Sequence, residues 1–239
     1  MFERLQLIIS EEDINKVKDK NILIVGVGGV GGACFEALVR LGVQKFTIID
    51  NDVFDKSNLN RQLLSNLSNI GQNKAKEAKI RGLNINNDCL IDYKEIFLIK
   101  ENIDEINIDS YDYIIDCCDT LTTKVLLIEK ALEHNKKIIC ATGTGNRLNP
   151  TMLKLTNIWK TNNDPLAKNL RKVLRDKNIK AKIPVVASDE LPIKTGERTV
   201  GSCALVPNTA GFYIAYWVFN DIINTGKWFY GENRWSTKE

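Results

Sequence analysis

The chain has 239 residues, 44% of them hydrophobic, so it can bury one substantial core but not two full, independent domains. Its 33 lysines and arginines and 30 aspartates and glutamates give a formal charge of +3, which is too small to diagnose a polyanionic partner by itself. The six cysteines are scattered without a Cys-x-x-Cys pair, and His134 is the only histidine. This composition favours buried reduced thiols over a disulfide framework and leaves a tetrahedral zinc site without ligands.

No stretch of the chain predicts a membrane partner. Acidic and polar residues appear by positions 10–13, so no apolar signal segment follows Met1. The most apolar window, residues 210–219, is bounded by Pro207 with Asn208 and by Asn220, and it reaches about half of the ~20 residues that a bilayer span needs. We expect a helix there, buried in the core or in an interface of a cytoplasmic protein.

The first part of the chain alternates between short apolar runs and helical patterns. Such alternation predicts an α/β fold, a Rossmann-like doubly wound and mostly parallel sheet that binds ligands at the carboxyl ends of its strands. The predicted strands cover residues 21–25, 45–50, 89–93, 113–116 and 137–142, and the predicted helices cover residues 33–41, with Gly42 as the stop, 72–83 and 121–133.

The pattern changes after Pro150. Residues 152–159 alternate like a strand with one exposed face, and Asp164 with Pro165 is typical of a helix start. Polar residues 188–199 predict a mobile loop. We therefore predict a single domain over residues 1–239, with a nucleotide-binding core at 20–145 and a C-terminal α+β extension at 150–225 that serves substrate binding and dimerisation.

A glycine-rich turn follows the first predicted strand and opens a helix, so that its backbone amides can meet a phosphate or a ribose without side chains in the way. Its glycines are Gly26, Gly28, Gly29 and Gly31. The turn alone fits a nicotinamide dinucleotide equally well. Asp50, at the end of the second strand, fits both ligands, because a carboxylate there accepts hydrogen bonds from ribose hydroxyls.

Further polar residues favour a triphosphate: Asn58, Arg61 and Gln62 in SNLNRQ, Lys74 in GQNKA, and Asp119 after the YIIDCCD strand. Arg61 and Lys74 can neutralise phosphate charge, and Asp119 offers the hard oxygen ligand that Mg²⁺ prefers. Lys74 alone would be explained better as part of a solvated helix face. The combination of all five residues favours the functional interpretation.

Together with the glycine turn and the pair Asp50 and Asp52, these residues resemble the ATP-binding set of the ThiF, MoeB and HesA superfamily, which is ubiquitin-activating-like and converts carboxylates into acyl-adenylates. The resemblance implies ATP and Mg²⁺ as cofactors, with a structural alkali cation as a further candidate. It implies a homodimer in which Arg4 reaches the partner's site. The implied catalytic residues are Asn58, Arg61, Lys74, Asp119 and Arg4, with Asp119 also the metal ligand, and the implied cofactor-binding residues are Gly26, Gly28, Gly29, Gly31, Asp50, Asp52 and Gln62.

Within that superfamily, members that adenylate ubiquitin-like sulfur carriers commonly have two Cys-x-x-Cys zinc pairs, which this chain lacks. Pro150-Thr151 and the Asp-Pro-Leu-Ala start of a basic helix at Asp164 resemble the tRNA threonylcarbamoyladenosine dehydratase branch. The resemblance implies an ATP-dependent dehydratase that adenylates the carboxylate of threonylcarbamoyladenosine in tRNA and cyclises it. It also implies a cysteine desulfurase or sulfur-acceptor system as a candidate partner.

The basic helix has two stripes at helical spacing. The apolar stripe is predicted to dock the helix, and the basic stripe to face outward. Such a face is often merely solvated, but beside an adenylation site it favours contacts to RNA phosphates. The apolar residues are Leu166, Leu170, Val173 and Leu174, and the basic residues are Lys168, Arg171, Lys172 and Arg175.

Cys203 leaves two interpretations open. It is either a nucleophile or sulfur acceptor, which requires a cation, a base or a helix N-terminus beside it, or a small buried thiol. The first interpretation belongs to an alternative function, an adenylyltransferase that activates the C-terminus of a ubiquitin-like sulfur carrier and passes it to Cys203. A second alternative, an NAD-dependent oxidoreductase, lacks a convincing acid/base pair for hydride transfer.

Overall fold

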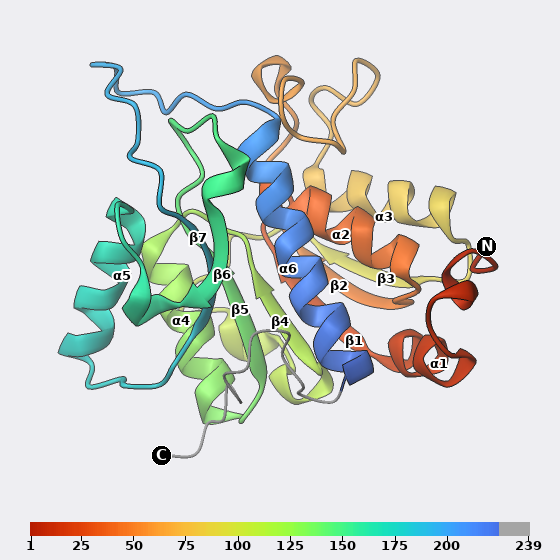
Figure 1. Cartoon of the computed structure of the whole chain (residues 1–239). Helices are drawn as coiled ribbons and strands as arrows, with labels where there is room; N and C mark the ends of the chain where they lie inside the picture. Colours follow the sequence, from red (N-terminus) through yellow and green to blue (C-terminus); the bar gives the residue numbers. More distant parts are fainter. Residues whose placement is uncertain (225–239) are drawn as a thin grey trace.

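The computed structural model describes residues 1–224, in which seven strands form one sheet of order β3-β2-β1-β4-β5-β7-β6 (Figure 1). The strands are β1 (Asn21–Val25), β2 (Lys45–Ile49), β3 (Leu90–Lys94), β4 (Tyr113–Asp116), β5 (Lys137–Ala141), β6 (Leu153–Asn157) and β7 (Pro184–Ser188). All neighbours are parallel except β6 and β7. The fold is therefore the predicted Rossmann-like, mostly parallel α/β fold.

Helices cover both faces of this sheet (Figure 1). The α-helices are α1 (Glu11–Asp19), α2 (Gly29–Leu41), α3 (Lys74–Ile85), α4 (Leu121–Glu133), α5 (Pro165–Asp176) and α6 (Leu205–Asn224). Single 3₁₀ turns lie before and between them: η1 (Leu5–Leu7), which precedes α1, and then η2 (Lys56–Asn58), η3 (Ile103–Glu105), η4 (Ile108–Ser110), η5 (Pro150–Met152) and η6 (Ile158–Lys160). None of the described helices is long and apolar enough to cross a membrane.

Strand periodicity divides the interior into two cores, because successive side chains of a strand point to opposite faces. In β1, Ile22 and Ile24 join the core beneath α2, α3 and α6, whereas Leu23 and Val25 join the core beneath α4 and α5. The strand is buried on both sides, as a central parallel strand should be. It therefore carries a rigid edge on which a site can be built.

Helix α6 departs from the prediction at both ends. The sequence suggested boundaries at Pro207 with Asn208 and at Asn220, but the helix runs from Leu205 to Asn224. Pro207 is tolerated because it lies in the first turn, where a backbone N–H has no partner inside the helix. Both asparagines are buried, so burial overrides their usual preference for helix ends. Gly211 lets α6 approach α2 closely, since a Cβ there would lie 2.3 Å from the carbonyl oxygen of Val30.

The C-terminal extension predicted at residues 150–225 shares the sheet of the core. Strand β7 pairs in parallel with β5, and β6 adds an antiparallel edge. The residues after β7, from 189 to 204, have no helix or strand and lead into α6. We call residues 189–204 the post-β7 segment.

Candidate nucleotide-binding site

A cavity of about 460 Å³ opens at the carboxyl ends of β1, β2 and β4. Strand β1 lies between the other two, where the strand order reverses, which is the position at which open α/β sheets bind ligands. Most residues of the predicted set line this cavity. They are Gly26, Gly28, Gly29, Asp50, Asp52, Asn58, Arg61, Gln62, Lys74 and Asp119.

The glycine turn brings backbone, not side chains, to one wall. Gly26 has φ +85°, and a Cβ on it would lie 2.9 Å from the backbone of Cys117. Helix α2 begins at Gly29 with Gly28 as its N-cap, so its first N–H groups are placed to bind an anion. Gly31 does not line the cavity; a Cβ there would lie 1.9 Å from the Gly26 carbonyl oxygen, so it acts by letting the helix pack on the turn.

Asp50 holds the glycine turn from the end of β2. Its Oδ2 accepts a hydrogen bond from the Val27 N–H at 2.8 Å, and its Oδ1 accepts one from the Asp52 N–H at 2.9 Å. Burial raises the pKa of the Asp50 carboxyl above its usual value, and the two amide hydrogen bonds partly oppose that change. The carboxylate has lone pairs left over for ligand hydroxyls.

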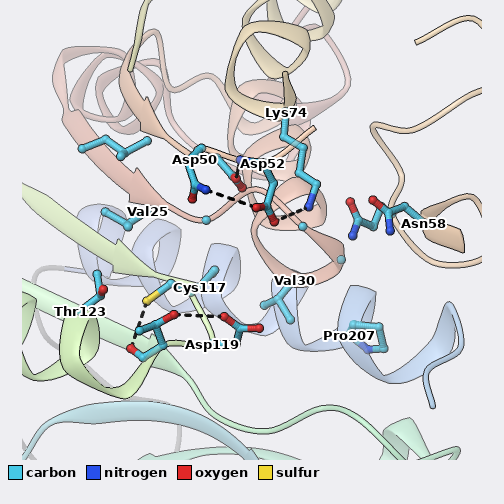
Figure 2. Close-up of a pocket in the computed structure, with 18 of the residues that line it drawn as sticks. Val25, Val30, Asp50, Asp52, Asn58, Lys74, Cys117, Asp119, Thr123 and Pro207 are labelled. Atoms are coloured by element: carbon cyan, nitrogen blue, oxygen red, sulfur yellow. Dashed lines mark hydrogen bonds and ion pairs between the residues drawn. The ribbon is translucent and has the colours of Figure 1, made fainter. Parts of the chain in front are cut away.

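Lys74 is buried rather than solvated, with 7% of its surface exposed. Its Nζ lies 2.9 Å from Asp52 Oδ2, while the Asp52 side chain is 60% exposed (Figure 2). The explanation of Lys74 as part of a solvated helix face is therefore wrong. Its position is fixed by Asn73, which caps α3 through the Lys76 N–H and binds the Asp50 and Asp52 carbonyl oxygens.

The SNLNRQ segment forms η2 and the turns after it. Asn58 is 8% exposed, and its Oδ1 accepts the Asp55 N–H at 3.2 Å as part of a capping box. The Arg61 guanidinium donates to the Ser57 carbonyl oxygen at 2.7 Å and to Asn60 Oδ1 at 2.9 Å. Gln62 is 7% exposed, and its Oε1 has no hydrogen-bond partner in the part of the chain that the structure describes. The segment thus presents amide and guanidinium groups to the cavity.

Asp119 lies in the loop between β4 and α4, on the opposite side of the cavity from Lys74 and Asp52 (Figure 2). It is exposed, and its Oδ1 accepts a hydrogen bond from Thr120 Oγ1 at 3.5 Å. Among residues 1–224, no group of three His, Cys, Asp or Glu side chains could hold a metal ion. A Mg²⁺ ion held here would need phosphate or water oxygens in addition to this carboxylate, which is how Mg²⁺ usually binds beside nucleotides.

A sequence profile of the ThiF family matches residues 2–205, a range that includes every residue lining the cavity except Pro207. The chain belongs to the ThiF family.

Several characterised proteins are similar to this ThiF-family chain over most of its length. It is 34% identical to the tRNA threonylcarbamoyladenosine dehydratase of Bacillus subtilis, over 93% of this chain and 94% of that protein. The dehydratase of Escherichia coli, TcdA, solved in complex with ATP, matches with a TM-score of 0.88 and 29% identity over 94% of both chains. The structure of E. coli MccB with AMPCPP shares the fold alone, at 18% identity and a TM-score of 0.65.

The sequence analysis missed a buried ion pair beside the cavity, formed by residues whose chain neighbours Cys117 and Thr123 line the cavity. Lys124 and Asp116 are both fully buried, with Lys124 Nζ 3.0 Å from Asp116 Oδ2 and 2.7 Å from the Ala141 carbonyl oxygen. Burial alone would lower the pKa of Lys124, but the charge of Asp116 outweighs it and the pKa is raised. Asp116 Oδ1 also accepts the Cys118 N–H at 3.2 Å, so the pair braces the loop that carries Asp119.

Cys203 lies two residues before α6 and is half-buried. Its Sγ lies 3.7 Å from the Arg147 carbonyl oxygen, a contact that does not activate a thiol. Cys203 itself does not line the cavity, although its neighbour Ser202 does.

Arg4 is far from the cavity of its own chain. It is the N-cap of η1. Nearby in the chain, the Phe2 ring lies 3.5 Å from the point that a Cβ on Gly42 would occupy, so this part of the chain packs beside Gly42. Gly42 ends α2, whose thirteen residues span about 20 Å from the glycine turn. A role for Arg4 in the site of a second protomer stays a prediction.

The basic helix α5 follows the prediction with one exception. Lys168, Lys172 and Arg175 are exposed, and Leu170 and Leu174 are fully buried. The prediction that Arg171 faces outward with the other basic residues is wrong. It is half-buried, and its guanidinium donates to Thr161, directly after η6, and to the Ile158 carbonyl oxygen at the start of η6. Arg171 lies next to the docked face of the helix, where its long side chain reaches these backbone carbonyl groups.

Proposed function

We propose that this protein is an ATP-dependent tRNA threonylcarbamoyladenosine dehydratase. The observation that most supports this function is the extent of the similarity to the Bacillus dehydratase. The similarity covers 93% of this chain and so extends beyond the residues that line the nucleotide-binding cavity. A shared nucleotide fold alone would support only adenylation.

The polar and charged groups that line the cavity suit ATP. We assign the ribose to Asp50, and the phosphates to the N-terminus of α2, to Asn58 and Gln62, and to the cations Arg61 and Lys74. The Lys74 ammonium is held in place by Asp52 before ligand arrives, so little side-chain entropy is lost when it meets a phosphate. Asp119 would hold Mg²⁺, which when bound neutralises phosphate charge as the leaving group departs.

In the proposed reaction, an oxygen of the threonine carboxylate attacks the α-phosphorus of ATP, and pyrophosphate leaves. The resulting acyl-adenylate has AMP as a good leaving group. The carbamoyl group of the same modified nucleoside then attacks the acyl carbon, loses a proton and expels AMP, so that the ring closes with net loss of water. Because nucleophile and acyl group belong to one molecule, the second step needs no enzyme nucleophile.

We propose that tRNA lies along the exposed face of α5. Asp164 caps this helix through the Ala167 N–H at 3.0 Å and also accepts the Gly143 N–H at 2.8 Å, next to the cavity residue Thr144. From there the charges of Lys168, Lys172 and Arg175 extend away from the cavity over about 10 Å of helix. Such a row can bind backbone phosphates without reading sequence.

We also propose a homodimer in the cytoplasm. Phe212 and Tyr216, one helical turn apart on α6, are 48% and 43% exposed, which suits an interface with a second copy. A dimer would give Arg4 a partner's cavity to reach. A cysteine desulfurase or sulfur-acceptor partner and an alkali cation stay predictions from the family resemblance.

The test is AMP release from ATP by the purified protein with Mg²⁺, comparing threonylcarbamoylated tRNA, unmodified tRNA and no RNA, with mass spectrometry of the nucleoside. The proposal requires AMP release and loss of one water from the nucleoside with modified tRNA only. Binding of ATP without RNA-dependent turnover would reject the tRNA substrate. The favoured substrate would then be the C-terminal carboxylate of a sulfur-carrier protein, tested with a Gly-Gly-ending carrier.

A further inference from the structure

Arg147 is a buried cation that the proposed chemistry does not use. Only 2% of its surface is exposed, yet it follows β5 in a loop next to the cavity. Burial lowers the pKa of the Arg147 guanidinium, which the nearby carboxylates of Asp164 and Glu190 oppose. Because an arginine remains charged in proteins, its burial has to be compensated by hydrogen bonds.

The guanidinium makes these hydrogen bonds to three separate segments of the chain. Nη1 donates to the carbonyl oxygen of Gly143, two residues after β5. Nη2 donates to the carbonyl oxygen of Asn163 at 2.8 Å, two residues before α5, and Nε donates to that of Glu190 at 3.0 Å, two residues after β7. A planar guanidinium offers this fork of donors, whereas a lysine offers only a single ammonium.

Two of these segments contribute residues to the cavity wall. We call residues 143–147 the pocket lip, since Thr144 in it lines the cavity. The Asn163 segment leads into α5, and the post-β7 segment contributes Ser202 to the lining. Arg147 therefore joins the cavity wall to the start of the basic helix, alongside Asp164, which accepts the Gly143 N–H and caps α5.

Asn146 strengthens the link between the pocket lip and the post-β7 segment. Its backbone N–H donates to the Gly201 carbonyl oxygen at 2.7 Å, its Oδ1 accepts the Gly201 N–H at 2.6 Å, and its carbonyl oxygen accepts the Ile193 N–H at 2.7 Å. Directly after Gly201, the segment is also held by Asn60, which donates to the Ser202 carbonyl oxygen at 2.9 Å. The segment thus connects the lip with the loop that carries Asn58 and Arg61.

We propose that Arg147 is a positioning residue for the RNA substrate: it fixes the pocket lip, the start of α5 and the post-β7 segment in one arrangement, so that a nucleoside whose RNA lies on α5 meets the bound ATP correctly. The inference rests on the proposed function. Arg147 touches neither ATP nor RNA in this account. Its loss therefore leaves ATP binding in place and impairs turnover of the modified tRNA.

The experiment compares Arg147→Lys and Asn146→Gly with Arg171→Lys. Arg171 is the matched control, since it also donates to backbone carbonyl oxygens in the same half of the molecule, but at η6 and not at the lip. Asn146→Gly keeps the left-handed backbone of φ +56° and removes only the Oδ1 acceptor, so it serves if the buried arginine variant fails to fold. We measure ATP dissociation constants, kcat and KM for modified tRNA, and amide hydrogen exchange.

With Arg147→Lys, we expect kcat to fall about 10- to 100-fold, as for a substrate misplaced by roughly 1 Å, with the ATP dissociation constant within about twofold of wild type. The amides of Gly143, Ile193 and Gly201 should exchange faster together, and Asn146→Gly should give a smaller change in the same direction. Arg171→Lys should alter none of these. Unchanged kcat and unchanged exchange at the lip would overturn the inference, as would a parallel loss of ATP binding.

A wild-type protein without activity on modified tRNA would reject the proposed function separately. In that case the exchange data alone decide the structural part of the inference. Coupled exchange of the lip and the post-β7 segment supports it, and independent exchange of the two rejects it.

Discussion

The two sides of the cavity differ in how far apart along the chain their residues lie. On the nucleotide side, the contacts join residues 22 or 23 positions apart, as in the Lys74–Asp52 ion pair and the hydrogen bond from Val27 to Asp50. On the α5 side, Arg147 bonds Glu190 across 43 positions, and Asn60 bonds Ser202 across 142. The nucleotide side is built from elements that follow one another along the chain from β1 to α3, whereas the α5 side exists only once the whole sheet has formed.

We therefore expect substitutions on the nucleotide side to abolish catalysis without unfolding the protein. Changes at buried contacts outside the cavity should instead act on stability or on substrate placement. Four substitutions test the contrast.

The largest effect on stability is expected for Lys124→Met. The substitution keeps the volume of the side chain but leaves the carboxylate of Asp116 buried and without its cation, which should lower the free energy of unfolding by about 3–5 kcal/mol. Denaturant titration measures it. The control is Lys130→Met on the same helix, whose partner Asp104 is 80% exposed, so that little or no loss of stability is expected.

A double variant sharpens this prediction. Asp116→Asn with Lys124→Met replaces the charged pair by neutral groups of similar volume and should recover most of the lost stability. If the double variant is no more stable than Lys124→Met alone, the unpaired buried charge is not the cause of the loss.

Lys74→Met should reduce kcat by about 10²- to 10³-fold, because the variant lacks a preorganised cation beside the phosphates. The melting temperature should change little, since Asp52, the ion-pair partner of Lys74, is largely exposed to solvent. AMP release under saturating ATP measures the effect. Lys76→Met, an exposed lysine two positions further along α3, is the control and should behave as wild type. Equal loss in both variants would point to a general effect of charge.

How much of this could be read from the sequence depends on whether the deciding contacts are local. Strands β1 and β4 and helix α4 have the predicted bounds, because their apolar periodicity is complete within the segment. The predicted residues that line the cavity could be recognised because they cluster in short motifs such as the glycine turn and SNLNRQ. Lys124 could not be recognised as buried, since its partner Ala141 belongs to another strand 17 positions away.

Other differences have the same origin. The bounds of α6 were wrong because Pro207 and Asn208, which looked like a boundary, lie inside a helix that packs closely on α2 at Gly211. Helix α1 was missed, although Ser10 caps it through the Asp13 N–H and three acidic residues fill its first turn, which is a local signal that could have been used. Arg147 gave no signal at all, because carbonyl groups contributed by three segments are invisible in a sequence.

A smaller effect is expected for Asp119→Asn, which keeps the size of the side chain and removes the charge. The Mg²⁺ concentration for half-maximal AMP release should rise about 10- to 100-fold, because a neutral amide is a weaker ligand for Mg²⁺. Excess Mg²⁺ should restore much of the rate. Asp92→Asn, exposed on the edge strand β3, is the control. A rate loss that Mg²⁺ does not reverse would assign Asp119 a role other than metal binding.

The smallest effect is expected for Lys172→Gln on the exposed face of α5. If Lys172 contacts one phosphate, the variant should bind tRNA a few times more weakly, and the slope of log K against log salt should fall by about one. Lys79→Gln is the control, because α3 packs on the β2 and β3 edge of the sheet, far from α5. Both variants should keep wild-type ATP affinity. Equal slopes for Lys172→Gln, Lys79→Gln and wild type would remove α5 from the RNA surface, and Arg147 would then join the cavity to a helix without a role in substrate binding.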